Sequence, residues 1–334
     1  MNKKTVEFFM IVTNRSVYIA DYCISSIIKV LDILSNDYHV QFKIYLNCLN
    51  TNKYEKFIAK WKNNKYTEIC FSELTPEDFT FTKGIYKAKN GKVYNYPLEF
   101  EEPFDKTYKN SNANYFIAVD SDFEVLNPIL VLDMLKYMEA HPDLPIFSTD
   151  RTETSQYFDS YSGDEIVLHE RNDTWFLIFN NNYKVNNISC HPVDFYIKPN
   201  GEKIFFQFGK DNWNEYIDNC KKQNGKRQVY DGTAWLQHQI RSIYPFEIIS
   251  IKDVHPKYDH MYIHYGAFSQ NNSINSPFKI KIYRYLTIRR KIGFVFLPDS
   301  LNKKVKVIYK KISDFYFVKS NEERKKQMSQ SNLD

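Results

Sequence analysis

The stretch that decides the fold is residues 114–126, which reads NYFIAVDSDFEVL. Its first half is continuously apolar, which is typical of a central parallel strand covered by helices on both faces. The strand ends in Asp120 and Asp122, one residue apart. If the strand continued, both carboxylates would point the same way, and if it bent at Ser121 they would converge. In either case the sequence predicts hard oxygen ligands where a buried strand reaches the surface.

The paired carboxylates suit a divalent cation that carries a phosphorylated ligand. Sites for Mg²⁺ and Mn²⁺ commonly use one or two carboxylates and leave the other positions to water and phosphate oxygens. A second interpretation stays open, in which the acidic pair forms a polar turn or caps the helix expected at residues 128–138. The strand before the pair and the Asn127-Pro128 helix start after it favour the metal site.

Composition indicates a globular protein from a reducing compartment. The chain has 334 residues, of which 43% are hydrophobic and 25% charged, enough for one large domain or two. Its five cysteines form no C-x-x-C pair and are odd in number, which favours buried thiols in a reducing compartment. The first apolar run is short and has no cleavage site, and no segment approaches the roughly 20 apolar residues of a membrane span. We therefore expect a cytoplasmic location, peripheral at the inner face of the cell membrane.

The order of predicted elements favours an α/β fold. Residues 6–12 predict a strand, and the next segment carries apolar residues at helical spacing. Strands at 40–46 and 67–71, with a helix at 54–61 between them, continue the alternation typical of a mixed, mainly parallel sheet flanked by helices. In such sheets ligands bind beyond the carboxyl ends of the strands.

The second half of the chain is less regular. Strands at 146–148 and 175–179, with further strands around Tyr196 and Phe205, predict a mixed extension of the sheet. A helix is expected at 234–243, directly after Asp231, and a short strand at 248–251. Residues 74–106 predict a loop.

The C-terminal segment has a different character. Residues 277–334 carry about fifteen Lys and Arg against about five acidic residues, interleaved with aromatic and aliphatic side chains. We expect a catalytic domain at 1–270 and a basic helical tail at 271–334 that attaches to an anionic membrane surface. A solvated tail or a protein-binding surface are the alternatives. Nucleic acid is not an expected partner, because no binding motif accompanies the charge.

Together, the β-α start, the alternating strands, the Asp120-Ser121-Asp122 motif, the later Asp231 before a helix, and the late His264-Tyr265-Gly266 resemble a nucleotide-sugar glycosyltransferase of the GT-A fold. The resemblance is closest to the large family 2-like group and covers roughly residues 5–270. It implies a Rossmann-like GT-A domain that uses Mn²⁺ or Mg²⁺.

The resemblance also implies roles for individual residues. Asp120 and Asp122 would bind the cation, with His264 completing the metal site. Ser121 and the two aspartates would contact the nucleotide diphosphate, and the turn after the first strand, Thr13, Asn14 and Arg15, would line the nucleotide pocket. An imidazole suits Mn²⁺ better than Mg²⁺. His255 and His260 are competitors for the role of His264.

The sequence departs from the family pattern at two positions. Residues 47–50 read NCLN, where many relatives have an acidic residue that holds the base. The acidic pair of inverting members is reduced to Tyr230-Asp231, so Asp231 is the candidate catalytic base. The alternative is that Asp231 is the N-cap of the helix that follows. Trp175, Trp213 and Trp235 are expected in the core rather than in the site.

The resulting hypothesis is a metal-dependent hexosyltransferase. It would move a sugar from a UDP- or GDP-sugar to a glycan or lipid-linked acceptor in bacterial surface polysaccharide synthesis, inverting the anomeric centre with Asp231 as base. A metal-dependent nucleotidyltransferase is one alternative and should show a glycine-rich phosphate loop, which is not evident among nine glycines. A non-catalytic carbohydrate-binding protein is the other.

Overall fold

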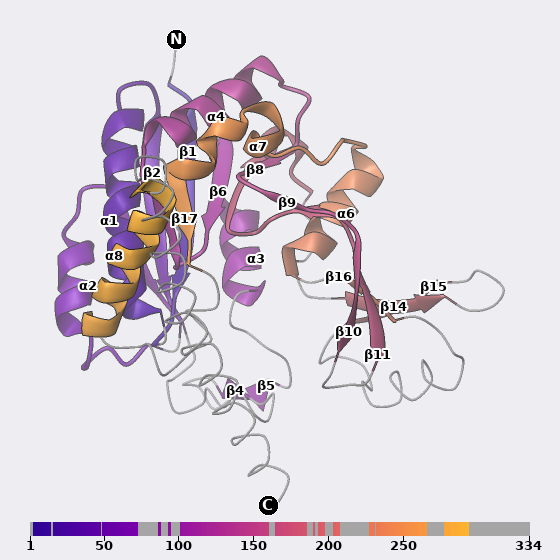
Figure 1. The fold of residues 1–334 in the computed structure, drawn as a ribbon, viewed down its shortest axis with the longest axis horizontal. Coiled ribbons are helices and arrows are strands. Elements are labelled where there is room, and N and C mark those ends of the chain that lie inside the picture. The colour runs from indigo at the N-terminus through magenta and orange to yellow at the C-terminus, as the bar shows by residue number, and fades with distance from the viewer. Residues whose placement is uncertain are drawn as a thin grey trace, which may run out of the picture.

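The structure is a computed structural model of the whole chain (Figure 1). It describes residues 3–14, 16–47, 49–72, 86–87, 93–94, 101–159, 164–185, 190, 193–197, 203–207, 227–230, 232–265 and 277–293.

A six-stranded sheet forms the centre of the molecule. Its order is β3-β2-β1-β6-β13-β8, and β3, β2, β1 and β6 are parallel, whereas β13 and β8 add antiparallel pairings. The bounds are β1 Thr5–Val12, β2 His39–Leu46, β3 Thr67–Phe71, β6 Tyr115–Val119, β8 Ile146–Ser148 and β13 Phe176–Asn180. This confirms the predicted mixed, mainly parallel sheet.

Alternate residues of β1 enter two different hydrophobic cores, as the pleat of a strand requires. Phe8 and Met10 lie in the core under α1 (Val17–Leu34) and α4 (Ile129–Ala140). Phe9 and Ile11 lie in the core under α3 (Glu101–Asn110) and α6 (Gly232–Ile243). Helices therefore cover both faces of the sheet, and α2 (Glu55–Lys62) packs against the first core through its buried Phe57 and Trp61.

Helix α1 forms where the apolar residues recur every three or four positions. The predicted positions are all buried, namely Ile19, Cys23, Ile27, Val30, Leu31 and Leu34. Helix α3 begins inside the segment predicted as a loop, and that part of the prediction is wrong. Its buried aromatics, Phe104 and Tyr108, lie one helical turn apart and stack with ring centroids 5.6 Å apart.

A second, five-stranded sheet lies apart from the central one (Figure 1). Its order is β10-β11-β16-β14-β15, with bounds Ser155–Asp159, Asp164–Leu168, Arg227–Tyr230, Val193–Ile197 and Lys203–Gln207. The predicted strands around Tyr196 and Phe205 do pair, but in this sheet rather than in an extension of the central one. Two short ribbons pair β9 (Arg151–Thr152) with β12 (Arg171–Asn172) and β4 (Tyr86–Lys87) with β5 (Val93–Tyr94).

The prediction of a strand at 248–251 is wrong. Among the residues that the structure describes, the only strand-type contact of this segment is an isolated bridge between Ser148 and Ser250, after which the chain enters the short helix α7 (Ile251–Val254). Ser250 and Asp253 form a capping box, and this local hydrogen bonding stabilises the helix start. Two 3₁₀ turns follow other elements, at Asn181–Tyr183 and Pro256–Met261.

The last described element is α8 (Pro277–Gly293), which falls within the predicted tail. It lies against α1 and the short strand β17 (Tyr262–His264), with Ile280 only 1% exposed. The described part of the tail is thus helical and docked, whereas the division of the chain at residue 270 stays a prediction. Within the described ranges, no helix combines the length and apolar character needed to cross a bilayer.

Candidate metal centre

The acidic motif lies in a tight turn at the carboxyl end of β6. The Phe123 amide donates to the Asp120 carbonyl at 3.1 Å, and the Asp120 amide donates to the Trp175 carbonyl at 2.9 Å. The chain therefore bends at Ser121, and the carboxylates converge, which was one of the two predicted arrangements. Neither aspartate caps the following helix, because the Asn127 side chain accepts from the Ile129 amide at 3.1 Å instead.

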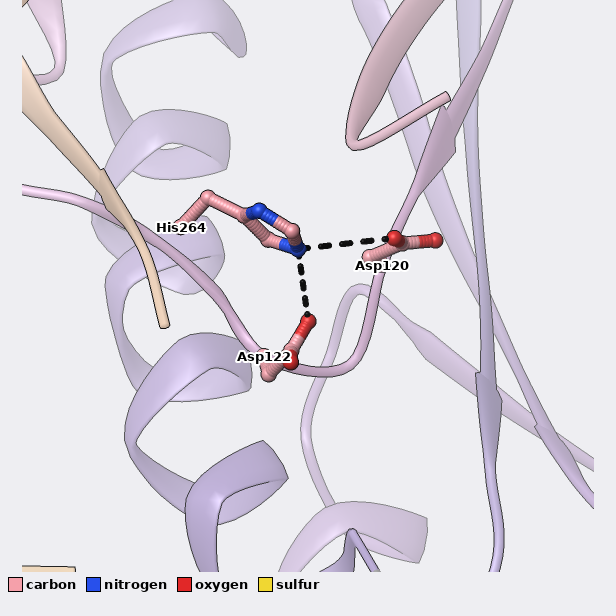
Figure 2. A group of neighbouring side chains, drawn as sticks. All are labelled: Asp120, Asp122 and His264. Carbon is pink, nitrogen blue, oxygen red and sulfur yellow. Dashed lines mark ion pairs between the residues drawn. The ribbon is translucent and has the colours of Figure 1, made fainter. Parts of the chain in front are cut away.

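His264 reaches the same point from a distant part of the sequence. After the turn, β7 (Phe123–Val125) pairs antiparallel with β17, so that His264 lies opposite Phe123. His264 Nε2 lies 3.2 Å from Asp122 Oδ1 and 3.8 Å from Asp120 Oδ2. Figure 2 shows the imidazole ring directed toward both carboxylates. The competing His255 and His260 are exposed and belong to no metal-ligating group among the residues that the structure describes.

The electrostatics of the cluster favour an added positive charge. Burial and the neighbouring Asp122 carboxylate raise the pKa of Asp120 to about 7, despite the opposing effect of His264. Burial lowers the pKa of His264, but the hydrogen bond and charge of Asp122, with the charge of Asp120, outweigh it and raise the pKa above the usual value. The proximity of the two carboxylates therefore favours a proton or an added cation at this site.

A divalent cation fits these residues. One ligand atom from each of Asp120, Asp122 and His264 lies within 4.8 Å of the other two. Two carboxylate oxygens and one imidazole nitrogen suit Mn²⁺ and are less typical of Mg²⁺. The Asp120 side chain is 31% exposed and that of Asp122 only 5%, so the group opens to solvent on the Asp120 side.

The turn after β1 lies near the same edge of the sheet. Phe9 pairs with Ala118 in parallel register, which sets the end of β1 level with the 120–122 turn. Thr13 and Asn14 are half-buried, and the Asn14 side chain accepts from the Asn50 amide at 2.9 Å, joining the turns that follow β1 and β2. Arg15 lies outside the described residues, so its predicted contact with the nucleotide stays a prediction.

Two residues of this region were not singled out for the site by sequence reasoning. The Trp175 ring packs on the first core, as predicted, but it also stacks on the His264 ring, with centroids 4.2 Å apart. Asp173 is buried, accepts a hydrogen bond from the Thr152 hydroxyl, and its charge raises the pKa of both Asp120 and His264. The sequence did contain a signal for both, because Asp173 and Trp175 directly precede the apolar run of β13.

The candidate base Asp231 lies outside the described residues, but its neighbours do not. In the sequence it directly precedes α6. Two hydrogen bonds join Gln237 of α6 to the backbone of Asn172, the residue before Asp173. The Asn172 amide donates to the Gln237 side-chain oxygen, and the Gln237 side-chain nitrogen donates to the Asn172 carbonyl, both at 2.8 Å. Both side chains are buried, so the middle of α6 lies beside the segment that leads into Asp173.

No family model and no curated protein matches the chain. Among solved structures it is similar to glucosyl-3-phosphoglycerate synthase from Mycobacterium tuberculosis, in complex with Mn²⁺, UDP and phosphoglyceric acid. The identity is 11% and the TM-score 0.28, over 43% of this chain and 42% of that one. The chain thus spans less than half the length of that synthase.

Two further structures have a comparable likeness. One is an active-site mutant of LgtC, with 11% identity and a TM-score of 0.28 over 53% of this chain and 57% of that one. The other is 4-diphosphocytidyl-2C-methyl-D-erythritol synthase from Anaerococcus prevotii, with 7% identity and a TM-score of 0.31 over 54% and 73%. At these values, the function of this chain has to be inferred from its own side chains.

Proposed function

We propose that this protein is a metal-dependent glycosyltransferase that uses a nucleoside-diphosphate sugar. The observation that carries the proposal is the convergence of Asp120, Asp122 and His264, whose ligand atoms lie within 4.8 Å of one another. They lie beside β1 and β6, where the strand order changes direction, since the chain runs outward from β1 to β2 and β3 and then returns to β6. Ligands of α/β sheets bind beyond the carboxyl ends of the strands at this kind of switch point.

The side chains would divide the work as follows. Asp120, Asp122 and His264 would hold the cation, and Thr13, Asn14, Arg15 and Ser121 would contact the nucleotide. The cation supplies Lewis-acid stabilisation of the charge that develops on a departing diphosphate. Asp231 would accept the proton of the acceptor hydroxyl in an inverting transfer. Its support is its position before α6, which is bonded to the Asp173 segment through Gln237.

The first test is calorimetry with UDP and GDP, with and without Mn²⁺, followed by a donor screen that measures release of the nucleoside diphosphate. Metal-dependent nucleotide binding supports the transferase. Binding of glycans alone would support the carbohydrate-binding alternative, and release of pyrophosphate rather than a nucleoside diphosphate would support the nucleotidyltransferase. More specifically, we propose that the donor is a UDP- or GDP-hexose and that the acceptor is a lipid-linked glycan in surface polysaccharide synthesis.

The base assignment has a separate test. Asp231→Asn should retain donor binding or donor hydrolysis and lose transfer to the acceptor, because only proton removal from the acceptor is affected. A variant that simply unfolds would show instead that Asp231 acts as a helix cap.

We also propose that α8 attaches the protein to an anionic membrane surface. Among its described side chains, the large apolar ones that are exposed are Phe278, Ile282 and Tyr285, by 73%, 42% and 57%. Their spacing places them on one face of the helix. The opposite face docks on the protein through Ile280. Apart from Arg284, which pairs with the buried Glu124, the helix contains five basic residues and no acidic ones. Its charge therefore complements anionic headgroups, at about 1 kcal/mol for each basic residue near the surface.

Liposome sedimentation tests this attachment without disturbing the docked face. Replacing Phe278, Ile282 and Tyr285 by Gln should release the protein from vesicles that contain phosphatidylglycerol. Phe71→Gln is the matched control, because Phe71 is 50% exposed but lies on β3. Unchanged vesicle binding of the triple variant would contradict the proposal.

A further inference from the structure

Three side chains from distant parts of the sequence, Glu124, Tyr265 and Arg284, meet next to the candidate metal centre. Glu124 of β7 accepts from the Tyr265 hydroxyl at 2.5 Å and from Arg284 Nε at 2.8 Å, both at Oε2. A second nitrogen of Arg284, Nη2, donates to Glu124 Oε1. Tyr265 follows β17 directly, and Arg284 comes from α8. The contact therefore joins β7, β17 and the C-terminal helix.

The contact between Glu124, Tyr265 and Arg284 is buried and directional, so it should hold these side chains in one arrangement. The Glu124 side chain is only 5% exposed, so its charge depends on these donors rather than on water. The paired guanidinium nitrogens bind the carboxylate at two points, which adds directional preference to the attraction. The hydrogen bond to Glu124 raises the pKa of Arg284, and burial raises the pKa of Tyr265. The Arg284 guanidinium also lies 4.6 Å from the centre of the Tyr22 ring on α1.

Each strand in this contact has a candidate metal ligand in it or directly next to it. Asp122 lies two residues before Glu124, and His264 lies one residue before Tyr265. The Tyr265 amide donates to the Asp122 carbonyl at 3.0 Å, and Ile263 pairs with Glu124. The ribbon of β7 and β17 has only three residues in each strand. So short a pair is marginal without further support, and a slip of one residue would turn His264 to the other face.

We propose that Glu124, Tyr265 and Arg284 are positioning residues for the metal centre. By joining β7 to β17 and both to α8, they hold His264 at its distance from Asp120 and Asp122. Helix α8 is then part of the site's construction and not only an attachment surface. The inference rests on the proposed metal site. It adds that cation binding requires Glu124, Tyr265 and Arg284 as well as the three ligands.

Variants that keep volume test the proposal. Glu124→Gln combined with Arg284→Gln replaces the ion pair by a neutral pair and leaves no unpaired buried charge. Tyr265→Phe removes one hydrogen bond and keeps the ring. The matched control is Ile280→Ala, which weakens the docking of α8 through an apolar contact outside the network. The measurements are the Mn²⁺ dissociation constant, from the electron paramagnetic resonance signal of free Mn²⁺, and the urea midpoint of the metal-free protein.

We expect the double variant to bind Mn²⁺ about tenfold more weakly, the lower end of the effect known for residues that orient metal ligands. Tyr265→Phe should weaken binding less, and Arg284→Lys should retain part of the affinity that the double variant loses. Ile280→Ala should lower the urea midpoint and leave Mn²⁺ affinity unchanged.

Equal Mn²⁺ affinity in the wild type, the double variant and Tyr265→Phe would overturn the proposal, and so would equal weakening in Ile280→Ala. If the double variant does not fold, Tyr265→Phe decides the question alone. Failure of the wild type itself to bind Mn²⁺ would overturn the metal site first and this inference with it, which separates the two claims.

Discussion

At the residue scale, Asp122 is the least exposed of the three candidate metal ligands. Its side chain is 5% exposed, against 16% for His264 and 31% for Asp120. The Asp122 carboxylate is repelled by Asp120 and attracted by His264, so these two effects on the stability of the fold oppose each other. A bound cation would be attracted by both carboxylates. The contribution of Asp122 to binding should therefore exceed its contribution to folding.

Asp122→Asn should abolish Mn²⁺-dependent nucleotide binding and transfer, because one of two anionic ligands is lost. The free energy of unfolding should change by less than about 1 kcal/mol, since repulsion from Asp120 is relieved at the same time. Calorimetry and urea unfolding measure the two quantities. Asp37→Asn, at an exposed aspartate in the turn after α1, is the control and should bind normally. Full activity in Asp122→Asn would refute the metal assignment.

Trp175 offers a spectroscopic test of the same site. Its ring stacks on His264 at 4.2 Å, so paramagnetic Mn²⁺ bound by His264 should quench its fluorescence, whereas diamagnetic Mg²⁺ should not. The Mn²⁺-dependent quenching should disappear in Trp175→Phe, which leaves the other tryptophans in place. Quenching that survives in Trp175→Phe would place the bound ion elsewhere.

Residues near one another in the sequence were the predictable part of this site. Asp120 and Asp122 could be paired because an apolar strand ends at them, and the structure brings them together. His264 lies far along the chain and was identified only through the family resemblance, because the pairing of β17 with β7 leaves no periodic signal in three-residue strands. Trp175 was assigned to the core, where it does pack, but its stacking on His264 depends on tertiary geometry.

At the element scale, the capping box of α7 supplies a prediction with a defined pH dependence. Asp253 accepts from the amide and hydroxyl of Ser250, both at 2.8 Å, and from Arg151 Nε at 3.1 Å. Burial opposes its ionisation, but these donors outweigh it and hold the pKa of Asp253 below the usual value. The ionised form is favoured by folding, so the stabilisation is present above the ordinary aspartate pKa and is lost as the pH falls through the lowered one.

Asp253→Asn should therefore cost about 1 kcal/mol of unfolding free energy at pH 7 and the same at pH 5. The cost should shrink as the pH falls through the lowered pKa of Asp253, because the wild-type carboxyl is then protonated as well. Urea unfolding at pH 7, at pH 5 and over a series of more acidic values measures it. Glu153→Gln is the control, because Glu153 pairs with the same Arg151 at 3.7 Å but is 81% exposed, and it should change stability by less than about 0.5 kcal/mol. A cost that grows as the pH falls would contradict this account.

Long elements with a clear period were predicted well, and short ones were not. The apolar residues of β1 and the helical spacing of α1 determine their burial directly. The segment at 248–251 has the apolar character of a strand, but the local hydrogen bonds of Ser250 and Asp253 make it a helix start. The strands around Tyr196 and Phe205 were predicted as strands, but the choice between two sheets depends on long-range pairing that a local pattern does not contain.

At the scale of the whole molecule, a bound cation and nucleotide should stabilise the fold. A ligand that binds only the folded state at one hundred times its dissociation constant adds about 2.7 kcal/mol. Mn²⁺ with UDP or GDP should therefore raise the melting temperature by several degrees in the wild type, and by much less in Asp122→Asn. Differential scanning fluorimetry checks this, with Mn²⁺ alone and nucleotide alone as controls. An equal rise in both proteins would mean that the ligand binds away from Asp122.

The central claim is that Asp120, Asp122 and His264 bind one divalent cation between them. The most direct measurement is anomalous diffraction at the manganese edge from crystals soaked with Mn²⁺ and UDP or GDP. We predict a single strong peak within bonding distance of both carboxylates and of His264 Nε2, with the diphosphate on its exposed side. A peak elsewhere, or carboxylates still bonded only to His264 at saturating Mn²⁺ and nucleotide, would contradict the claim.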